Sequence, residues 1–288
     1  MKPTRLLSPN PGMLGIALAL FFACNNNNPG NDHQKAPDTT ASADHHGGEI
    51  LLKDNEVKAE APDAGSKSEQ GYANPRHGDN QAQSPIDIIS ANAGKPKVET
   101  SFIFNTEINA AENHGHTIEL EFKEGSTCTM NGIAYASKQF HFHTPSEHLV
   151  DGITYPMEMH IVNTMNDSST GNKPSYLVVA VLFKIGAENK FLKEFMEKIP
   201  GEEGDKHVLQ SNEVKLDDLF SEFKKDEIKS FYSYNGSLTT PPYTESVRWM
   251  VLKHVVEASE DQVMAIEKLE GNNARHVQAL NERKVYSQ

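Results

Sequence analysis

Three histidines in two short segments have the types and the spacing of a metal site. His141 and His143 flank Phe142, and His160 ends the segment 157–160. Side chains alternate along a β-strand, so residues two apart point to the same face. A third imidazole from a neighbouring strand gives three neutral nitrogen ligands and leaves the fourth tetrahedral position of Zn²⁺ open to water. This pattern predicts a catalytic zinc that activates hydroxide.

The residues around these histidines are typical of the strands that must position them. Phe140 and Phe142 alternate with the histidines and fall on the opposite face, as in a half-buried strand. Residues 149–152 are typical of a turn, and residues 155–162 alternate again. Strand, turn and strand bring His160 back beside the first two histidines. Taken by itself, a His-x-His pair is also compatible with ordinary surface or core histidines.

Several segments together resemble one known family. QFHFHTPSEH, MEMHIV and GSLTTPP look like the signature segments of the α-class carbonic anhydrases in their bacterial form, and similar segments occupy 83–88, 113–116 and 273–281. They follow the family's order over residues 83–286. The resemblance implies a mainly β fold with flanking helices around a large, twisted, mostly antiparallel central sheet. It also implies zinc-dependent, reversible hydration of carbon dioxide to bicarbonate and a proton by zinc-bound hydroxide.

The resemblance assigns catalytic roles to three further residues. Thr239 matches the hydroxyl that accepts the proton of the zinc hydroxide and donates to Glu147, which orients the hydroxide toward the substrate. His116 matches the proton-shuttle histidine, since an imidazole titrates near neutral pH. His114 lies close by and either competes or cooperates with it.

Other residues are expected to support the ligands and the substrate. By resemblance, Gln139 orients His141 and Glu158 orients His160, and each lies two residues before its ligand on the same strand face. Carbon dioxide needs an apolar wall, for which the family positions are Val162, Val178, Leu238, Val247 and Trp249, and Thr240 is expected to bind substrate as well. Ser84, His148 and Tyr234 are expected to form structural hydrogen bonds around Glu147 and the sheet.

The N-terminal region has the pattern of an export signal. Lys2 and Arg5 precede a short apolar run that ends at Cys24, as in a bacterial lipoprotein signal. Ordinary signal cleavage and a retained anchor are the alternatives. Residues 1–24 are thus predicted to be a signal peptide, 25–70 a disordered polar tether, and 71–288 the catalytic domain. We expect an exported protein, periplasmic or at the cell surface, that is held to the membrane by a lipid on Cys24.

Composition narrows the partners and the function. The net charge of −13 disfavours nucleic acid, whose phosphates require lysine and arginine patches. Carbon dioxide and bicarbonate are the expected small-molecule partners, and the oligomeric state is left open. Cys128 lies in an alternating stretch and is expected to be a small buried hydrophobe. The alternatives to an active carbonic anhydrase are a catalytically weak binding module with the same fold, and an esterase that uses the same hydroxide.

Elsewhere, alternation predicts strands over 117–122, 138–143, 158–162, 176–183 and 247–254. Apolar residues spaced for one helical face predict helices over 190–198 and 259–269. The segment 70–79 is short and poor in aromatics compared with the family, and the chain has a single tryptophan.

Overall fold

The computed structural model describes residues 81–288, apart from 97–100, 167–173, 222 and 225–226. The expected signal peptide with Cys24, the expected tether 25–70 and the short segment 70–79 lie outside these residues. None of the described helices has the length and the apolar run that a membrane span requires.

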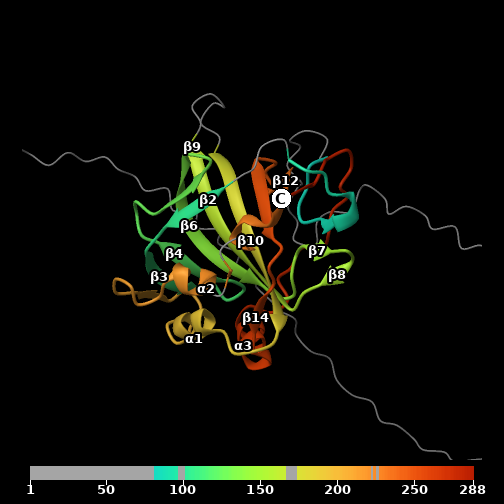
Figure 1. Cartoon of the computed structure of the whole chain (residues 1–288). Helices are drawn as coiled ribbons and strands as arrows, with labels where there is room; N and C mark the ends of the chain where they lie inside the picture. The colour runs from blue at the N-terminus through green and yellow to red at the C-terminus, as the bar shows by residue number, and fades with distance from the viewer. Residues whose placement is uncertain (1–80, 97–100, 167–173, 222, 225–226) are drawn as a thin grey trace, which may run out of the picture. The chain divides into compact units, whose positions relative to one another are not determined.

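Strands dominate the described residues, which confirms the expected mainly β fold (Figure 1). The strands are β1 (Asp87–Ile88), β2 (Phe102–Asn105), β3 (Ile108–Asn113), β4 (Ile118–Phe122), β5 (Thr127–Met130), β6 (Ile133–His143), β7 (Leu149–Val150), β8 (Ile153–Thr154), β9 (Met157–Asn166), β10 (Pro174–Ile185), β11 (Lys206–Val208), β12 (Phe231–Gly236), β13 (Val247–Leu252), β14 (Val256–Ala258) and β15 (Tyr286–Ser287). The α-helices are α1 (Lys190–Met196), α2 (Leu216–Phe220) and α3 (Glu260–Glu270), and short 3₁₀ turns occupy Ser90–Asn92 and Glu227–Lys229.

One large sheet contains the strands that carry the histidines. Its order is β11-β3-β4-β6-β9-β10-β13-β12-β15, with β5 and β2 extending from β6 and β14 pairing with β10. Its pairs are antiparallel except where β10 meets β13 and β14. The strands β1, β7 and β8 form a separate small sheet.

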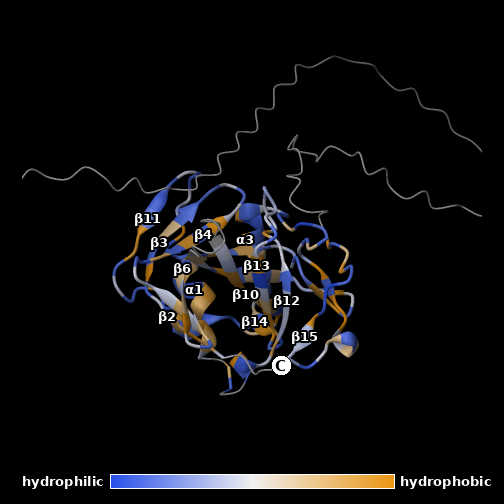
Figure 2. Ribbon diagram, turned by 90° about the horizontal axis from the view of Figure 1, so that it is seen from above, coloured by the Kyte–Doolittle hydropathy of each residue, from blue (hydrophilic) through white to orange (hydrophobic). Residues whose placement is uncertain are grey.

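The two faces of the large sheet have different partners. On one face, Phe140, Phe142 and other strand residues pack against α1, α2 and α3 in the main core. Figure 1 shows these helices near one end of the sheet, and Figure 2 shows mostly hydrophilic loops around more hydrophobic strands. On the other face, a smaller cluster forms around Val178, Tyr234 and Trp249. The histidines alternate with Phe140 and Phe142, so they project from this second face.

Local signals explain where the elements begin and turn. Ser259 and Gln262 form a reciprocal capping box at the start of α3. Asp151 and Gly152 both have positive φ, at 52° and 77°, and connect β7 to β8 in the expected tight turn. The expected strands and helices are all found, with ends that differ by a few residues.

Strand β6 contains a β-bulge, which simple alternation of the residue types does not predict. Ser137 pairs with Asn163 and Gln139 with Val162, so Lys138 is an extra residue in the ladder. Tyr135 and Phe140 therefore both reach the main core although their numbers differ in parity. Gln139 and the two histidines share a face by their spacing, and the bulge puts that face opposite the one that Tyr135 shares with Phe140.

Candidate metal centre

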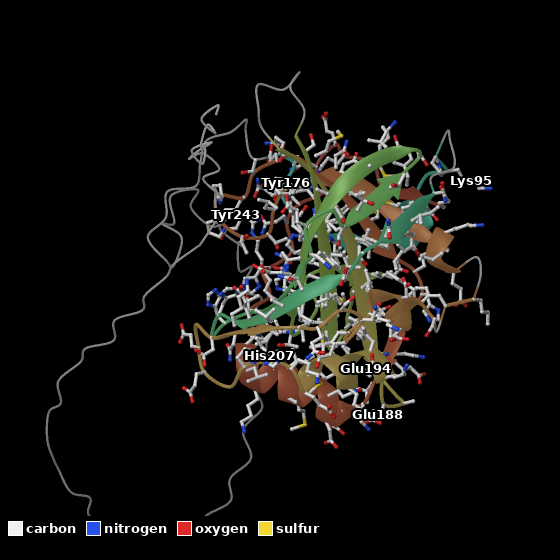
Figure 3. All side chains as sticks on the ribbon, turned by 90° about the vertical axis from the view of Figure 1, so that its left-hand side faces the viewer. Lys95, Tyr176, Glu188, Glu194, His207 and Tyr243 are labelled. Atoms are coloured by element: carbon white, nitrogen blue, oxygen red, sulfur yellow. The ribbon has the colours of Figure 1, made fainter. Side chains whose placement is uncertain are left out.

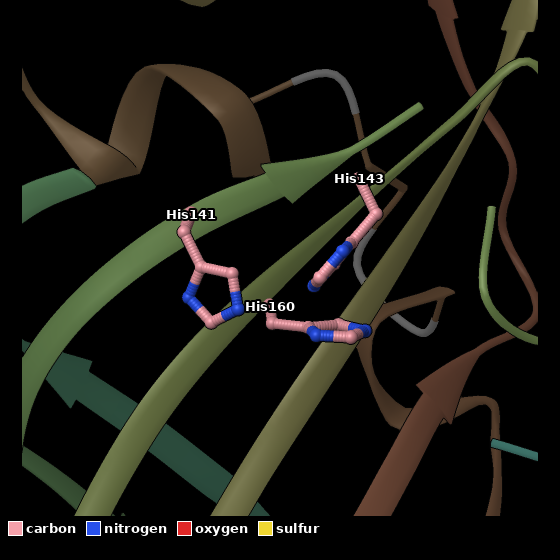
Figure 4. Close-up of side chains that lie close together, drawn as sticks. All are labelled: His141, His143 and His160. Atoms are coloured by element: carbon pink, nitrogen blue, oxygen red, sulfur yellow. The ribbon is translucent and has the colours of Figure 1, made fainter. Parts of the chain in front are cut away.

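Two neighbouring strands bring the three predicted histidines together. His141 on β6 is the direct cross-strand partner of His160 on β9, and His143 follows on the same face. One possible ligand atom from each ring lies within 4.8 Å of the others. Figure 4 shows the three rings gathered around a common space. The return of His160 beside His141 is therefore confirmed, but the expected turn 149–152 is wrong in part, because Leu149–Val150 form strand β7 of the small sheet.

Hydrogen bonds to the rings decide which nitrogen atoms are left for a metal. His141 Nδ1 lies 2.8 Å from Gln139 Oε1, and His160 Nε2 lies 2.7 Å from Glu158 Oε1. Each contact occupies one nitrogen, so Nε2 of His141 and Nδ1 of His160 are left. Neither nitrogen of the buried His143 makes a hydrogen bond of standard geometry among the described residues, although the Asn273 backbone interacts with the ring and acts to raise its pKa. A metal ligand needs one free ring nitrogen and commonly donates from the other, so His143 can offer a nitrogen to a metal.

Burial controls the protonation of the rings. Burial lowers the pKa of His141 well below its usual value, and the charges of the other two rings lower it further. Burial also lowers the pKa of His143. Burial acts the same way on His160, but the charge and hydrogen bond of Glu158 outweigh it and raise the pKa of that ring. His141 and His143 are thus neutral at neutral pH, as nitrogen ligands must be.

Glu147 lies directly beside the histidines. Its side chain is buried, and Oε1 accepts a hydrogen bond of 2.9 Å from the backbone N–H of Arg275. The other oxygen, Oε2, has no partner among the described residues and lies 3.6 Å from His143 Nε2 and 3.9 Å from His160 Nδ1. The role of Arg275 was not predicted, because a backbone contact has no signal in residue type.

A chain of hydrogen bonds extends from His160 into the interior. Glu158 Oε1 also lies 2.6 Å from His148 Nδ1, and His148 Nε2 lies 2.7 Å from the hydroxyl of Tyr234. That hydroxyl donates to Ser84 Oγ at 2.9 Å. These residues form structural hydrogen bonds on the sheet, as expected, and none of these bonds reaches Glu147. His148, Tyr234 and Ser84 therefore hold Glu158, the carboxylate that contacts His160, in place.

The loop after β12 carries Thr239 and Thr240. A turn closes it, with the N–H of Tyr243, labelled in Figure 3, donating to the Thr240 carbonyl at 2.9 Å. The Arg275 guanidinium lies 3.8 Å from the centre of the Tyr243 ring. Arg275 therefore contacts both this loop and Glu147. The structure shows no hydrogen bond between Thr239 and Glu147, so the predicted pairing stays a prediction.

Most of the predicted apolar wall is found in one cluster. Val178, Val247 and Trp249 are buried, and Val162 and Leu238 pack against them. Val162 and Val178 are direct cross-strand partners. The ring centre of Trp249 lies 4.8 Å from that of His160, so the cluster adjoins the ligands. Thr240 is exposed on its loop and does not belong to this cluster.

His116 lies on the turn between β3 and β4 and is exposed. Asn273 connects this turn to the end of β6, because its Nδ2 donates to the carbonyls of His116 and Phe142 at 3.2 and 3.1 Å. Phe142 stands between the two histidines of β6, so the turn is held close to the ligands. Sequence reasoning assigned no role to Asn273.

Comparison with known proteins now identifies the family. The family model for eukaryotic-type carbonic anhydrase matches residues 68–288. The chain belongs to this family. It is accordingly an enzyme of the carbonate dehydratase class, with carbon dioxide and bicarbonate as its small-molecule substrates.

Bacterial relatives and solved structures agree with this assignment. The chain is 36% identical over 208 residues to a carbonic anhydrase of Neisseria gonorrhoeae, covering 70% of this chain and 76% of the relative. It matches the α-carbonic anhydrase of Photobacterium profundum with a TM-score of 0.62 and 33% identity, covering 72% and 90% of the two chains. The enzyme from Thermovibrio ammonificans, solved with the inhibitor sulfanilamide, gives a TM-score of 0.62 and 38% identity, covering 72% and 87%.

Cys128 is buried and free, as expected. Burial raises the pKa of its thiol to about 12, so it stays a protonated core residue.

Proposed function

We propose that the chain hydrates carbon dioxide at a zinc ion held by His141, His143 and His160. The observation that carries the proposal is the buried ring of His143, which makes no hydrogen bond of standard geometry among the described residues, beside two rings whose remaining nitrogens point to the same space. Three imidazoles suit zinc, and a bound zinc ion lowers the pKa of a coordinated water to about 7, which supplies hydroxide at neutral pH.

The remaining groups orient the reaction and exclude competing water. Glu147 is positioned to accept a hydrogen bond on Oε2, the oxygen that faces the ligands. We assign the donor to the hydroxyl of Thr239. The oxygen of that hydroxyl can then accept a hydrogen bond from the hydroxide that a bound zinc ion would supply. The cluster of Val162, Val178 and Trp249 offers an apolar surface to an uncharged substrate. Thr240, on the same loop as Thr239, is proposed to contact substrate from the solvent side.

Proton release needs a group that reaches solvent, and we assign it to His116. The side chain is exposed, and the Asn273 contact holds its turn near the ligand strand. An imidazole exchanges protons efficiently near neutral pH because its usual pKa is about 6.5.

The test is stopped-flow carbon dioxide hydration with the full chain, combined with metal analysis. We expect one zinc ion per chain, fast hydration, and loss of hydration with a zinc chelator or with sulfanilamide. Replacing His143 with alanine should remove both zinc and activity. Stoichiometric zinc without hydration would contradict the proposal and favour a binding module.

We also propose that the chain is exported and anchored through a lipid on Cys24. The support is the charged start, the apolar run and the cysteine that follows it. Metabolic labelling with a clickable fatty acid should mark the wild-type chain in membrane fractions and leave Cys24→Ser unlabelled and soluble after cell breakage. Equal labelling of both would exclude this cysteine as the anchor.

A further inference from the structure

The turn between β3 and β4 displays two histidines from a fixed backbone. The N–H of His114 donates to the Thr117 carbonyl at 2.9 Å, and the N–H of Gly115 donates to Asn113 Oδ1 at 2.8 Å. Gly115 has a φ of 77°, and a Cβ there would lie 2.6 Å from the carboxyl carbon of Glu203. Only glycine fits this position without strain. The directions in which the two imidazoles leave the turn are therefore set by the backbone.

A row of ionisable side chains crosses the sheet beside this turn. Lys206 on β11 stands opposite Glu112 on β3, Glu112 opposite Glu119 on β4, and Glu119 opposite His141 on β6. Directly opposite residues in a sheet share a face. This acidic row, defined by Glu112 and Glu119, thus extends from the metal face to the edge strand β11.

His114 reaches back onto the acidic row. Its Nε2 lies 3.4 Å from Glu112 Oε2, and its side chain is 40% exposed while that of Glu112 is 19% exposed. Because Glu112 shares a face with His141, the ring of His114 lies on the metal side of the sheet. It therefore combines contact with an internal carboxylate and access to solvent.

The His114 ring lies beside a carboxylate that is held by a lysine. Burial acts to raise the pKa of Glu112, but its contacts with Lys206 and the charge of His114 hold that pKa below its usual value. Glu112 is thus ionised at neutral pH and stabilises a positive ring 3.4 Å away. Glu119 and Glu121 on β4, Glu203 beside Gly115 and His116 on the same turn are the other ionisable groups in this region.

We propose that His114 is a second proton-relay residue, which carries protons from the metal site to solvent in parallel with His116. The proposal rests on carbon dioxide hydration at the three-histidine site. The neutral ring, with Nε2 toward Glu112, takes up a proton at Nδ1 through intervening water. The resulting imidazolium is held by Glu112 and then gives the proton to an external buffer base, which restores the neutral ring.

The experiment compares kcat and kcat/KM for carbon dioxide hydration in full-length, zinc-loaded variants at low and high buffer concentration. Proton transfer by a positioned side chain contributes about 10²- to 10⁴-fold, and two parallel routes share it. We expect His116→Ala to lower kcat by less than ~10-fold and His114→Ala/His116→Ala to lower it by at least ~10-fold more. Imidazole buffer should restore both variants, and kcat/KM should stay near wild type.

A control variant and a second readout make the result specific. His207→Ala removes an exposed histidine from the neighbouring strand β11 (Figure 3) and should leave kcat unchanged. In nuclear magnetic resonance spectra recorded at one pH, the ring signal that disappears in His114→Ala should move in Glu112→Gln, because the contact between the ring and the carboxylate is lost. This readout reports the ion pair without relying on turnover.

The outcomes separate this inference from the proposed function. If wild type hydrates carbon dioxide and the double variant equals His116→Ala, His114 is not a relay. If Glu112→Gln leaves the His114 ring signal unchanged, the carboxylate does not hold the ring and the proposed route is wrong. If wild-type protein with bound zinc shows no hydration, the proposed function itself fails, and the relay fails with it.

Discussion

The carboxylate of Glu158 joins the ring of His160 to the interior of the protein. One oxygen, Oε1, lies 2.7 Å from His160 Nε2 and 2.6 Å from His148 Nδ1, and all three side chains are buried. Burial alone would raise the pKa of Glu158, but the two rings lower it well below its usual value. The His160 ring is therefore oriented by a carboxylate that stays ionised and is held in place by two hydrogen bonds.

Replacing Glu158 with glutamine should weaken zinc binding by about 10-fold, because the amide oxygen keeps the geometry but loses the negative charge. The measurement is competition for zinc against a chelator of known affinity. Glu267→Gln, which changes an exposed carboxylate on α3, is the matched control. Unchanged zinc affinity in Glu158→Gln would show that geometry alone supports the ligand.

Thr239 should matter through its hydroxyl rather than its size. We expect Thr239→Val to lower kcat/KM for carbon dioxide by about 10²-fold, since a lost orienting contact misplaces the attacking group, while Thr239→Ser keeps most of the activity. Both variants should bind one zinc ion. If valine and serine lose activity equally, the methyl group rather than the hydroxyl is required.

Glu270 should make stability depend on pH. Its side chain is buried at the end of α3, where Oε2 accepts the Ile118 N–H at 3.3 Å, Oε1 has no partner among the described residues, and burial raises the pKa to about 8. The folded state therefore holds a proton that the unfolded chain, with a usual pKa near 4.5, releases. Folding is thus favoured most below about pH 4.5, and this contribution is lost as the pH rises toward 8.

Glu270→Gln should remove this loss, so its free energy of unfolding should change less between pH 5 and pH 8 than that of wild type. Urea unfolding at several pH values gives the comparison, with Glu267→Gln as the control. The difference at pH 8 should be on the order of a few kcal/mol. Parallel curves for wild type and Glu270→Gln would mean that Glu270 is ionised in the folded protein.

Gly236 lies where the backbone approaches the buried polar chain. A Cβ at this position would overlap Ser84 Oγ and lie 2.9 Å from Tyr234 Cε2 and 3.1 Å from Trp249 Cδ1. Gly236→Ala should therefore destabilise the fold by about 1–3 kcal/mol and lower the melting temperature. Gly201→Ala, which meets nothing within 4 Å, should be near neutral. Similar melting temperatures for the two variants would show that Ser84 moves aside at little cost.

The grouping of the three histidines could be predicted because it depends on local parity. His141 and His143 share a face by their spacing alone, and β9 returns His160 to them after a connection that carries β7 and β8. Glu158 and Gln139 followed from the same rule, since each lies two residues before its ligand. Short-range alternation carries this kind of information reliably.

Long-range contacts had no comparable signal. The backbone N–H of Arg275 donates to Glu147, which lies 128 residues earlier in the sequence. The residue type of an arginine does not indicate that its main chain is the donor. His148 bonds to Glu158 on β9 and not to its chain neighbour Glu147, a pairing that residue types alone do not indicate. The register that aligns Glu112, Glu119 and His141 also depends on pairing between strands, which one sequence does not specify.

The bulge at Lys138 has a consequence for how this domain tolerates change. The extra residue reverses the alternation, so that odd-numbered residues before it and even-numbered residues after it point to the same face of the sheet. Substitution of Lys138 leaves that reversal intact, whatever side chain is introduced. Deletion of this one residue would turn one side of the bulge toward the wrong layer, so that either Tyr135 leaves the main core or Phe140 and Phe142 exchange faces with His141 and His143. The face on which these two histidines lie thus depends on the number of residues in β6.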